Sequence, residues 1–285
     1  MQEGSSVTEE EKAEWTALVG SPEDVETAHR VPATPQTLAP AYRLAVDDRD
    51  FLLREELRPV RLQLELLKPE LSLQERKIRS TVVLFGGARI PEPGKEATAG
   101  RTPGQKRNLE ANAHYYEEAR QFARLASQYS ATTYFREMIV VTGGGPGVME
   151  AGNRGADDVG APSIGFNIVL PHEQAPNRYV TPGLCFNFHY FAIRKMHFLM
   201  RAKAIAVFPG GFGTLDEMFE SLTLIQTRRM EPLPFLLFGS EFWSKVIDFD
   251  ELARQGTISP DDPSLFHKVD TAAQGWEIVR SHYAL

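Results

Sequence analysis

Three clusters of glycine follow short apolar runs in this 285-residue chain. They are Gly86 and Gly87 after TVVLF (81–85), Gly143, Gly144, Gly145 and Gly147 after MIVVT (138–142), and Gly210, Gly211 and Gly213 after AIAVF (204–208). Glycine permits a sharp turn and lets a ligand approach the backbone closely. A helix that follows such a turn offers free N–H groups and the positive end of its dipole to an anion. The three clusters therefore predict a phosphate-binding site.

The standard glycine motifs narrow the class of phosphate ligand. Gly143, Gly145 and Val148 do not complete the dinucleotide pattern G-x-G-x-x-G. The segment from Gly94 to Gly100 has neither the spacing nor the Lys-Ser/Thr pair of a nucleoside-triphosphate loop. We therefore expect a nucleoside monophosphate rather than a dinucleotide or a triphosphate.

Two charged segments lie close to these turns in the sequence. Arg194 belongs to NFHYFAIRKMHFLMRAKA, which we expect to form a helix that leads into the run 204–208. The alternative interpretation is that its basic residues form a solvated stripe on this helix. Thr214 and Glu217 begin the helix after the third cluster, and as Thr-x-x-Glu they fit a capping box with a purely structural role. The competing interpretation is that Glu217 faces the pocket. A carboxylate there stabilises an oxocarbenium-like sugar and positions the attacking water.

Histidine and cysteine indicate little further chemistry. The seven histidines are dispersed without an H-E-x-x-H pattern, so we expect no metal site. The single cysteine, Cys185, forms no internal disulfide, fits a small buried apolar residue better than a nucleophile, and is typical of a reducing compartment.

The chain's other apolar runs indicate the fold. Two further apolar runs, at 163–170 and 234–238, add to the three that precede the glycine clusters. Amphipathic stretches separate the five runs. Strand and helix in alternation predict an α/β fold with a Rossmann-like, doubly wound parallel sheet in three α/β/α layers. The carboxyl ends of parallel strands lie along one edge, where ligands of such sheets bind, so the glycine clusters are expected to converge there. We expect residues 90–109 to form a surface loop near that edge.

Composition and charge divide the chain further. We expect an acidic, mobile tail over residues 1–40, a helical appendage over 41–79, and a nucleotide-binding catalytic domain over 80–285. Residues 1–29 hold eight acidic residues and one basic residue, which accounts for the whole net charge of −7. This balance disfavours a nucleic-acid or membrane partner. The acidic amino terminus and the lack of a long apolar run predict a cytoplasmic protein.

Two motifs resemble those of a known family. GGGPGVMEAGNRGA (143–156) and PGGFGTLDE (209–217) are similar to GGGxxGxM and PGGxGTxxE, the signatures of the LONELY GUY (LOG) family. The resemblance covers roughly residues 81–250. Its members have a Rossmann-like fold and include phosphoribohydrolases, which release a free base and ribose 5-phosphate from a cytokinin riboside monophosphate or AMP. Members are often labelled lysine decarboxylases, but this chain shows no recognisable pyridoxal-phosphate lysine motif.

The resemblance implies roles for individual residues. It implies that Arg194 and Glu217 are catalytic. The residues that match the phosphate and nucleotide site, or adjoin it, are Gly86, Gly87, Arg89, Gly143, Gly144, Gly145, Gly147, Met149, Lys195, Gly210, Gly211, Gly213 and Thr214. One position departs from the family, because His197 stands where short plant-type members have a substrate-contacting glutamate. This departure and the helical appendage are more like the longer bacterial members.

Two functions follow as expectations. The first is an N-glycosidase that cleaves a nucleoside 5′-monophosphate without a cofactor and assembles, as family members do, into a homo-oligomer. The second is a non-catalytic protein that binds or carries a nucleotide or cofactor in the same pocket. The presence of both Arg194 and Glu217 favours the enzyme, because a carrier needs the glycine turns but not that pair.

Overall fold

The structure is a computed structural model that describes residues 21–170 and 175–285. The chain divides into two compact units, one that ends at Gln63 and one that spans Leu64–Leu285. The first 20 residues of the expected acidic tail lie outside the described residues, as do residues 171–174. The remainder of that tail includes helix α2 (Ser21–Ala28).

The first unit is built from short helical elements. After α2 come η1 (Pro40–Tyr42), α3 (Arg49–Leu52) and η2 (Glu55–Leu57). The Asp48 carboxylate caps α3 by accepting hydrogen bonds from the N–H groups of Asp50 and Phe51. Helix α4 (Arg58–Glu75) begins in this unit and continues into the second.

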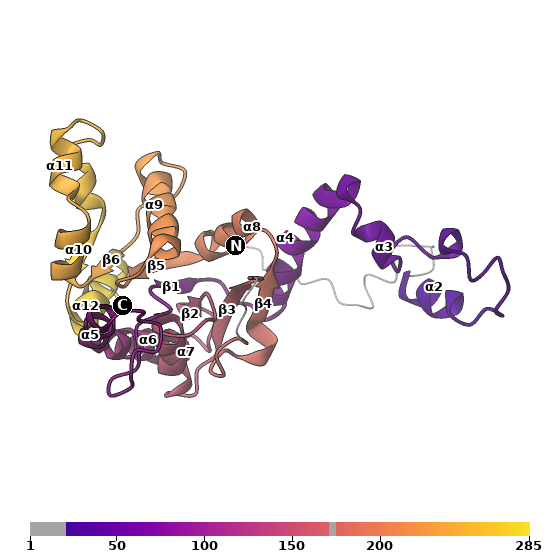
Figure 1. Cartoon of the computed structure of the whole chain (residues 1–285), viewed down its shortest axis with the longest axis horizontal. Coiled ribbons are helices and arrows are strands. Elements are labelled where there is room, and N and C mark those ends of the chain that lie inside the picture. The colour runs from indigo at the N-terminus through magenta and orange to yellow at the C-terminus, as the bar shows by residue number, and fades with distance from the viewer. Residues whose placement is uncertain (1–20, 171–174) are drawn as a thin grey trace. The chain divides into compact units, whose positions relative to one another are not determined.

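The second unit is built on a seven-stranded sheet in which every neighbouring pair of strands is parallel (Figure 1). The strand order is β4-β3-β2-β1-β5-β6-β7. The chain therefore winds outward from β1 in one direction and from β5 in the other, and a doubly wound parallel sheet is confirmed. The strands are β1 (Thr81–Phe85), β2 (Ile139–Thr142), β3 (Ser163–Ile168), β4 (Cys185–Phe188), β5 (Ala202–Val207), β6 (Phe235–Phe238) and β7 (His267–Val269).

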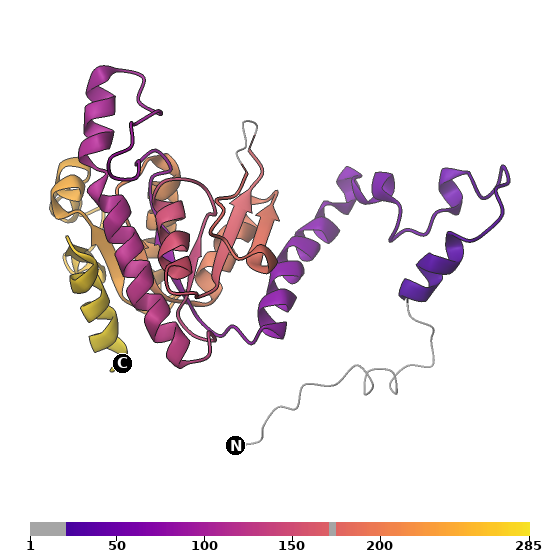
Figure 2. The same cartoon turned by 90° about the horizontal axis from the view of Figure 1, so that it is seen from below.

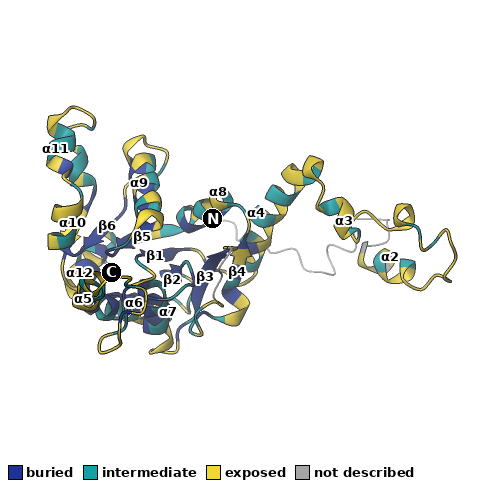
Figure 3. Ribbon diagram, viewed as in Figure 1, coloured by how far each residue is buried: buried dark blue, intermediate teal, exposed yellow. Residues whose placement is uncertain are grey.

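Helices cover both faces of this sheet, so its strands are buried throughout the middle of the unit (Figures 2 and 3). Strand β1 shows the alternation: Val83 and Phe85 pack with α4, α8 and α9, while Val82 and Leu84 pack with α6, α7 and α12. The helices of this unit are α5 (Pro103–Ala111), α6 (His114–Thr132), α7 (Val148–Asp157), α8 (Phe191–Met200), α9 (Phe212–Gln226), α10 (Ser240–Val246), α11 (Phe249–Arg254) and α12 (Ala272–Tyr283), with η3 (Pro182–Leu184) and η4 (Asp262–Leu265).

The structure corrects two local expectations. Residues 90–109 are only partly a loop, because α5 begins at Pro103 and the Thr102 hydroxyl caps it by accepting from Gln105 N–H. Asn187 and Phe188, expected at the start of the helix that carries Arg194, belong instead to strand β4, which pairs with β3. Among the helices that the structure describes, none has the length and apolar character needed to span a membrane.

Candidate active site

The three glycine turns lie on neighbouring strands. They follow β2, β1 and β5, which are adjacent at the centre of the sheet, so all three turns are at one edge. Hydrogen bonds join them directly. Gly87 N–H donates to the carbonyl of Pro209 at 3.0 Å, and Val148 N–H donates to the carbonyl of Gly87 at 3.2 Å. The structure thus brings the three clusters together, between β1 and β5 where the winding reverses, which is the position that ligands occupy in open α/β sheets.

Two of the glycines are required by close backbone approach. Gly147 precedes α7 with a φ of +70°, and a side chain there would collide with the backbone of Gly87 and Ala88. Gly86 leaves no room for a side chain because it packs against Val148. These positions lock the first turn to the second.

Met149 and Asn167 enclose the turn after β2. The sulfur of Met149 lies beside the Cα of Gly143 and its methyl group beside that of Gly145, and the side chain of Asn167 packs against Gly144. Gly144 has a φ of +73°, which a residue with a side chain rarely adopts. Met149, which the sequence placed in the nucleotide site, therefore shapes this turn.

Arg194 reaches from α8 to the same turn. Its Nε donates to the carbonyl of Phe166 in β3 at 2.7 Å, and its Nη2 lies against Gly143. The guanidinium also lies over the ring of Phe198, with its central carbon 5.1 Å from the ring centroid. Burial lowers the pKa of Arg194, although the neighbouring Glu217 opposes that shift. Arg194 is thus a buried, fixed cation rather than part of a solvated basic stripe.

Glu217 on α9 is the partner of this cation. Nη1 of Arg194 lies 3.2 Å from Oε1 of Glu217, and only 14% of the glutamate side chain is exposed. Burial raises the pKa of Glu217 to about 7, with Arg194 acting in the opposite direction. The residue is therefore poised between its neutral and charged forms near neutral pH, unlike the ordinary carboxylate that the reference pKa of about 4.3 would suggest.

The capping-box interpretation of Thr214 and Glu217 is wrong. Helix α9 begins after Gly211, which is its N-cap and makes no side-chain cap. Thr214 lies in the first turn, where its hydroxyl packs against Gly210. Nothing lies within 4 Å of the side-chain positions of Gly211 and Gly213, so the amino end of α9 is open. The first N–H groups of an α-helix have no partner within the helix, so they are available to an anion.

Lys195 and Arg89, two other residues expected in the nucleotide site, differ in their contacts. Lys195 on α8 pairs with Glu220 at 2.6 Å and with Asp216 at 3.3 Å, so α9 already neutralises its charge. Burial opposes charge on Lys195, but these two ion pairs outweigh that effect and raise its pKa. Arg89 is exposed after β1 and forms no ion pair within the described part of the chain. Lys195, Glu217 and Glu220 share a small recess with Phe85, Phe198, Leu199 and Ser221.

His197 lies away from this recess. It is 2% exposed and packs between Phe166 and Phe188, with ring centroids 5.7 and 5.4 Å away. Burial lowers its pKa, and the charges acting on it are those of Glu70 and Arg201. The position of His197 therefore does not suit a proton donor to the leaving base. Phe186 and Phe188 are likewise core residues.

Helix α4 holds both ends of α8. The Glu65 carboxylate accepts hydrogen bonds from His189 N–H at 2.8 Å and Tyr190 N–H at 3.0 Å, where α8 begins. Just beyond the other end, Arg201 donates two hydrogen bonds to Glu70, at 2.6 and 2.7 Å. These contacts were not predictable from the sequence, since nothing in the spacing links α4 to a helix more than 100 residues away. They fix the helix that carries Arg194.

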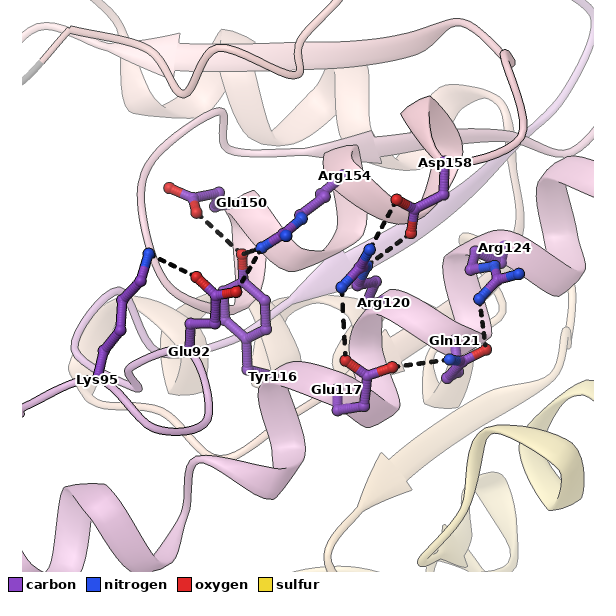
Figure 4. A network of polar contacts seen from close by, with 10 residues as sticks. All are labelled: Glu92, Lys95, Tyr116, Glu117, Arg120, Gln121, Arg124, Glu150, Arg154 and Asp158. Atoms are coloured by element: carbon purple, nitrogen blue, oxygen red, sulfur yellow. Dashed lines mark hydrogen bonds and ion pairs between the residues drawn. The ribbon is translucent and has the colours of Figure 1, made fainter.

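A polar network on the α6 and α7 side of the sheet, opposite α8 and α9, supports the turn after β1 (Figure 4). Arg154 on α7 donates to Glu92 at 2.8 Å, and Tyr116 on α6 donates to Glu150 at 2.9 Å. Nearby, Arg120 and Asp158 form a two-bond ion pair between α6 and α7. Glu150 and Arg154 lie in the second glycine motif, and their side chains contact Tyr116 and Glu92. Within residues 21–170 and 175–285, no group of three or more His, Cys, Asp or Glu side chains is arranged to hold a metal ion.

One protein-family model matches part of the chain. Residues 149–279 match the family model described as "Possible lysine decarboxylase". No curated protein matches the chain in sequence.

Several solved structures are similar to part of this chain. The molybdenum cofactor binding protein from the phototrophic bacterium Rippkaea orientalis is 16% identical, with a TM-score of 0.46 over 72% of this chain and 98% of its own. A protein designated TM1055 is 19% identical, with a TM-score of 0.45 over 71% and 99%. The molybdenum cofactor carrier protein of Chlamydomonas reinhardtii is 16% identical, with a TM-score of 0.45 over 72% and 99%.

The matched residues begin at Met149, so they include most of α7, the Arg194–Glu217 pair and the turn into α9, but not the glycines at 143–147. The family model thus covers the second of the two sequence motifs in full and the first only from Met149 onward. Residues 149–279 match the domain described as a possible lysine decarboxylase, a name often given to LOG-family domains.

Proposed function

We propose that this protein is a phosphoribohydrolase that cleaves the N-glycosidic bond of a nucleoside 5′-monophosphate, such as AMP or a cytokinin riboside monophosphate. One observation carries the proposal. A buried Arg194–Glu217 pair lies beside three joined glycine turns at the carboxyl edge of the sheet. The turns suit a phosphate, and the carboxylate suits a reaction that develops positive charge on a sugar.

The phosphate end of the substrate binds to backbone groups in this proposal. The open amino end of α9, from Gly211 to Thr214, offers free N–H groups and the helix dipole to the 5′-phosphate. A phosphate anchored there fixes the ribose, so binding energy from a remote group aligns the anomeric carbon. Open space around Gly211 and Gly213 leaves room for this approach.

Glu217 acts at the anomeric carbon. Its ionised form stabilises the oxocarbenium-like transition state and orients the attacking water. A pKa near 7 suits this role, because a carboxylate held in a buried site is a stronger base than one in water. Arg194 keeps the carboxylate in place, since its Nε is fixed to the Phe166 carbonyl while Nη1 faces Glu217.

The test is release of free base. The full chain is incubated with AMP and with isopentenyladenosine monophosphate, and the products are separated by chromatography. Glu217→Gln and Arg194→Ala should each reduce kcat by roughly 100-fold or more, whereas Glu75→Gln, a change at an exposed glutamate of α4, should not. If the wild-type protein binds a nucleotide and releases no base, the protein is instead a nucleotide or cofactor carrier.

We also propose that the protein forms a homo-oligomer through α4. Leu64, Leu67 and Leu71 recur along one side of this helix and are each about half exposed. Their spacing is typical of a helix that packs against another helix. Light scattering after size-exclusion chromatography should show more than one chain per particle, and Leu67→Glu should lower that mass.

A further inference from the structure

Asn177 joins the segment that follows β3 to the glycine turn after β2. Its backbone N–H donates to the Gly144 carbonyl at 2.8 Å. Its side-chain Nδ2 donates to the same carbonyl and to that of Gly145, both at 3.0 Å, and to Oδ1 of Asn153 at 2.9 Å. Its Oδ1 accepts from Tyr179 N–H at 3.2 Å. The side-chain amide of Asn177 thus donates hydrogen bonds to two consecutive carbonyls of the turn.

These hydrogen bonds close a ring. Oδ1 of Asn153 also accepts from the Thr142 hydroxyl at 2.7 Å, and that hydroxyl accepts from Gly144 N–H at 2.9 Å. Both the N–H and the carbonyl of Gly144 are therefore held, one through Thr142 and the other through Asn177. Asn153 and Thr142 are fully buried, so water does not compete for these bonds.

The ring fixes the direction of a hydrogen-bond donor. In a trans peptide the carbonyl of one residue and the N–H of the next point in opposite directions. Because Asn177 holds the Gly144 carbonyl, the Gly145 N–H points away from Asn177. Within the described part of the chain, no acceptor is bonded to that N–H.

We propose that Asn177 is a positioning residue for substrate binding: it orients the Gly144–Gly145 peptide so that the Gly145 N–H donates to an anionic or carbonyl-like oxygen of the bound nucleotide. The inference rests on the proposed function, because it needs a ligand in this pocket. Asn177 itself touches the turn and not the ligand.

The residue type follows from the acceptors around it. Asparagine supplies two donor hydrogens toward three oxygens and one acceptor toward Tyr179 N–H. Aspartate has the same shape but, when ionised, turns an anionic oxygen toward those three oxygens. Alanine removes the side-chain contacts and leaves the carbonyls to water, since Asn177 is only partly buried.

The experiment compares Asn177→Asp with Asn177→Ala. Dissociation constants for AMP and ribose 5-phosphate are measured by calorimetry at pH 8, with KM and kcat for base release measured alongside. We expect Asn177→Ala to weaken binding roughly tenfold, as for loss of one placed donor to a charged group, and Asn177→Asp to weaken it further. In both variants kcat at saturation should stay within about threefold of wild type.

Asn108→Asp is the matched control, because Asn108 is exposed on α5 and the change adds the same charge. It should bind nucleotide as the wild type does. Melting curves at pH 8 confirm that each variant is folded at the assay temperature. A space-filling role predicts the reverse order, with the isosteric Asn177→Asp binding better than Asn177→Ala, and that order would overturn the inference. Equal binding by all four proteins would overturn it too.

The outcomes also separate this inference from the proposed reaction. Wild-type protein that binds AMP but releases no base contradicts the phosphoribohydrolase, yet the order of affinities still tests Asn177. Base release with unchanged affinity in both variants supports the enzyme and contradicts the role of Asn177. Wild-type protein that binds neither ligand contradicts both.

Discussion

Arg194 and Glu217 lie 23 positions apart in the sequence and meet between α8 and α9, with Nη1 3.2 Å from Oε1. Neither side chain is more than 14% exposed. Burial opposes charge on both members of the pair, while each favours charge on the other. The balance leaves the pKa of Glu217 at about 7, so protonation of this single residue is expected to govern the site near neutral pH.

The first prediction concerns the pH dependence of hydrolysis. If the ionised form of Glu217 is active, kcat/KM should rise with pH and level off above about 7, following the pKa of the free protein. Rates at subsaturating AMP between pH 5 and 9 measure this. The substrate phosphate has a second pKa of about 6. Measuring the binding of ribose 5-phosphate over the same pH range separates this ionisation from that of Glu217. A profile already level at pH 5.5 would contradict a raised pKa for Glu217.

The second prediction concerns stability. The pKa of Glu217 is about 7 in the folded protein and about 4.5 when the chain is unfolded, so the folded state holds a proton that the unfolded state has released. Stability from this group is full below about pH 4.5 and falls as pH rises to about 7. The loss is at most about 3 kcal/mol.

Glu217→Gln lacks this titration and keeps the shape of the side chain. The melting temperature of the wild type relative to that of Glu217→Gln should therefore fall between pH 4.5 and 7 and then stay constant. Thermal scans of both proteins in matched buffers measure the difference. A difference that does not change across this window would show that Glu217 has an ordinary pKa.

The sequence predicted the sheet well because its signals are local. Runs such as TVVLF are buried on both faces, and their apolar character alone marks β1, β2, β5 and β6. Strand β4 was missed because it is only four residues long, contains the polar Asn187, and is separated from the aromatic helix α8 by only two residues. The turns at Gly86 and Gly147 converge because β1 and β2 are adjacent. The sequence predicted that both turns lie at one edge, since the carboxyl ends of parallel strands share that edge.

The polar supports of the site could not be predicted in this way. Glu65 meets Tyr190 across 125 positions of sequence, and Asn177 meets Gly144 across 33. No periodicity links such partners, since each contact depends on how separate elements pack in the folded chain. The pKa of Glu217 was missed for the same reason: burial is a tertiary property, and the residue type alone indicates an ordinary carboxylate.

The third prediction tests the hold of α4 on α8. Glu65→Ala removes the acceptor for His189 and Tyr190 N–H, which are left without their partner at the start of the helix. We expect a loss of about 1–2 kcal/mol in the free energy of unfolding, as for other helix caps. Because α8 carries Arg194, kcat should fall as well.

Glu75→Ala is its control, since Glu75 is exposed at the end of the same helix. Urea unfolding and base-release assays of the two variants give the comparison. If both variants lose the same stability, the cap at Glu65 does not stabilise α8. If Glu65→Ala is destabilised while its kcat is unchanged, α4 supports the fold without positioning Arg194.

The fourth prediction concerns the close approach of two turns. Gly147→Ala places a methyl group against the carbonyl of Gly87 and the backbone of Ala88, at a φ of +70°. Both the collision and the backbone conformation oppose the substitution, so we expect a loss of about 2–4 kcal/mol, through displacement of the turn after β1. Gly104→Ala in α5 has only ordinary contact with Thr102 and should be neutral or stabilising by up to about 1 kcal/mol. Urea unfolding of both variants measures the difference in their free energies of unfolding. If Gly147→Ala is as stable as Gly104→Ala, the two turns can move apart without loss of stability.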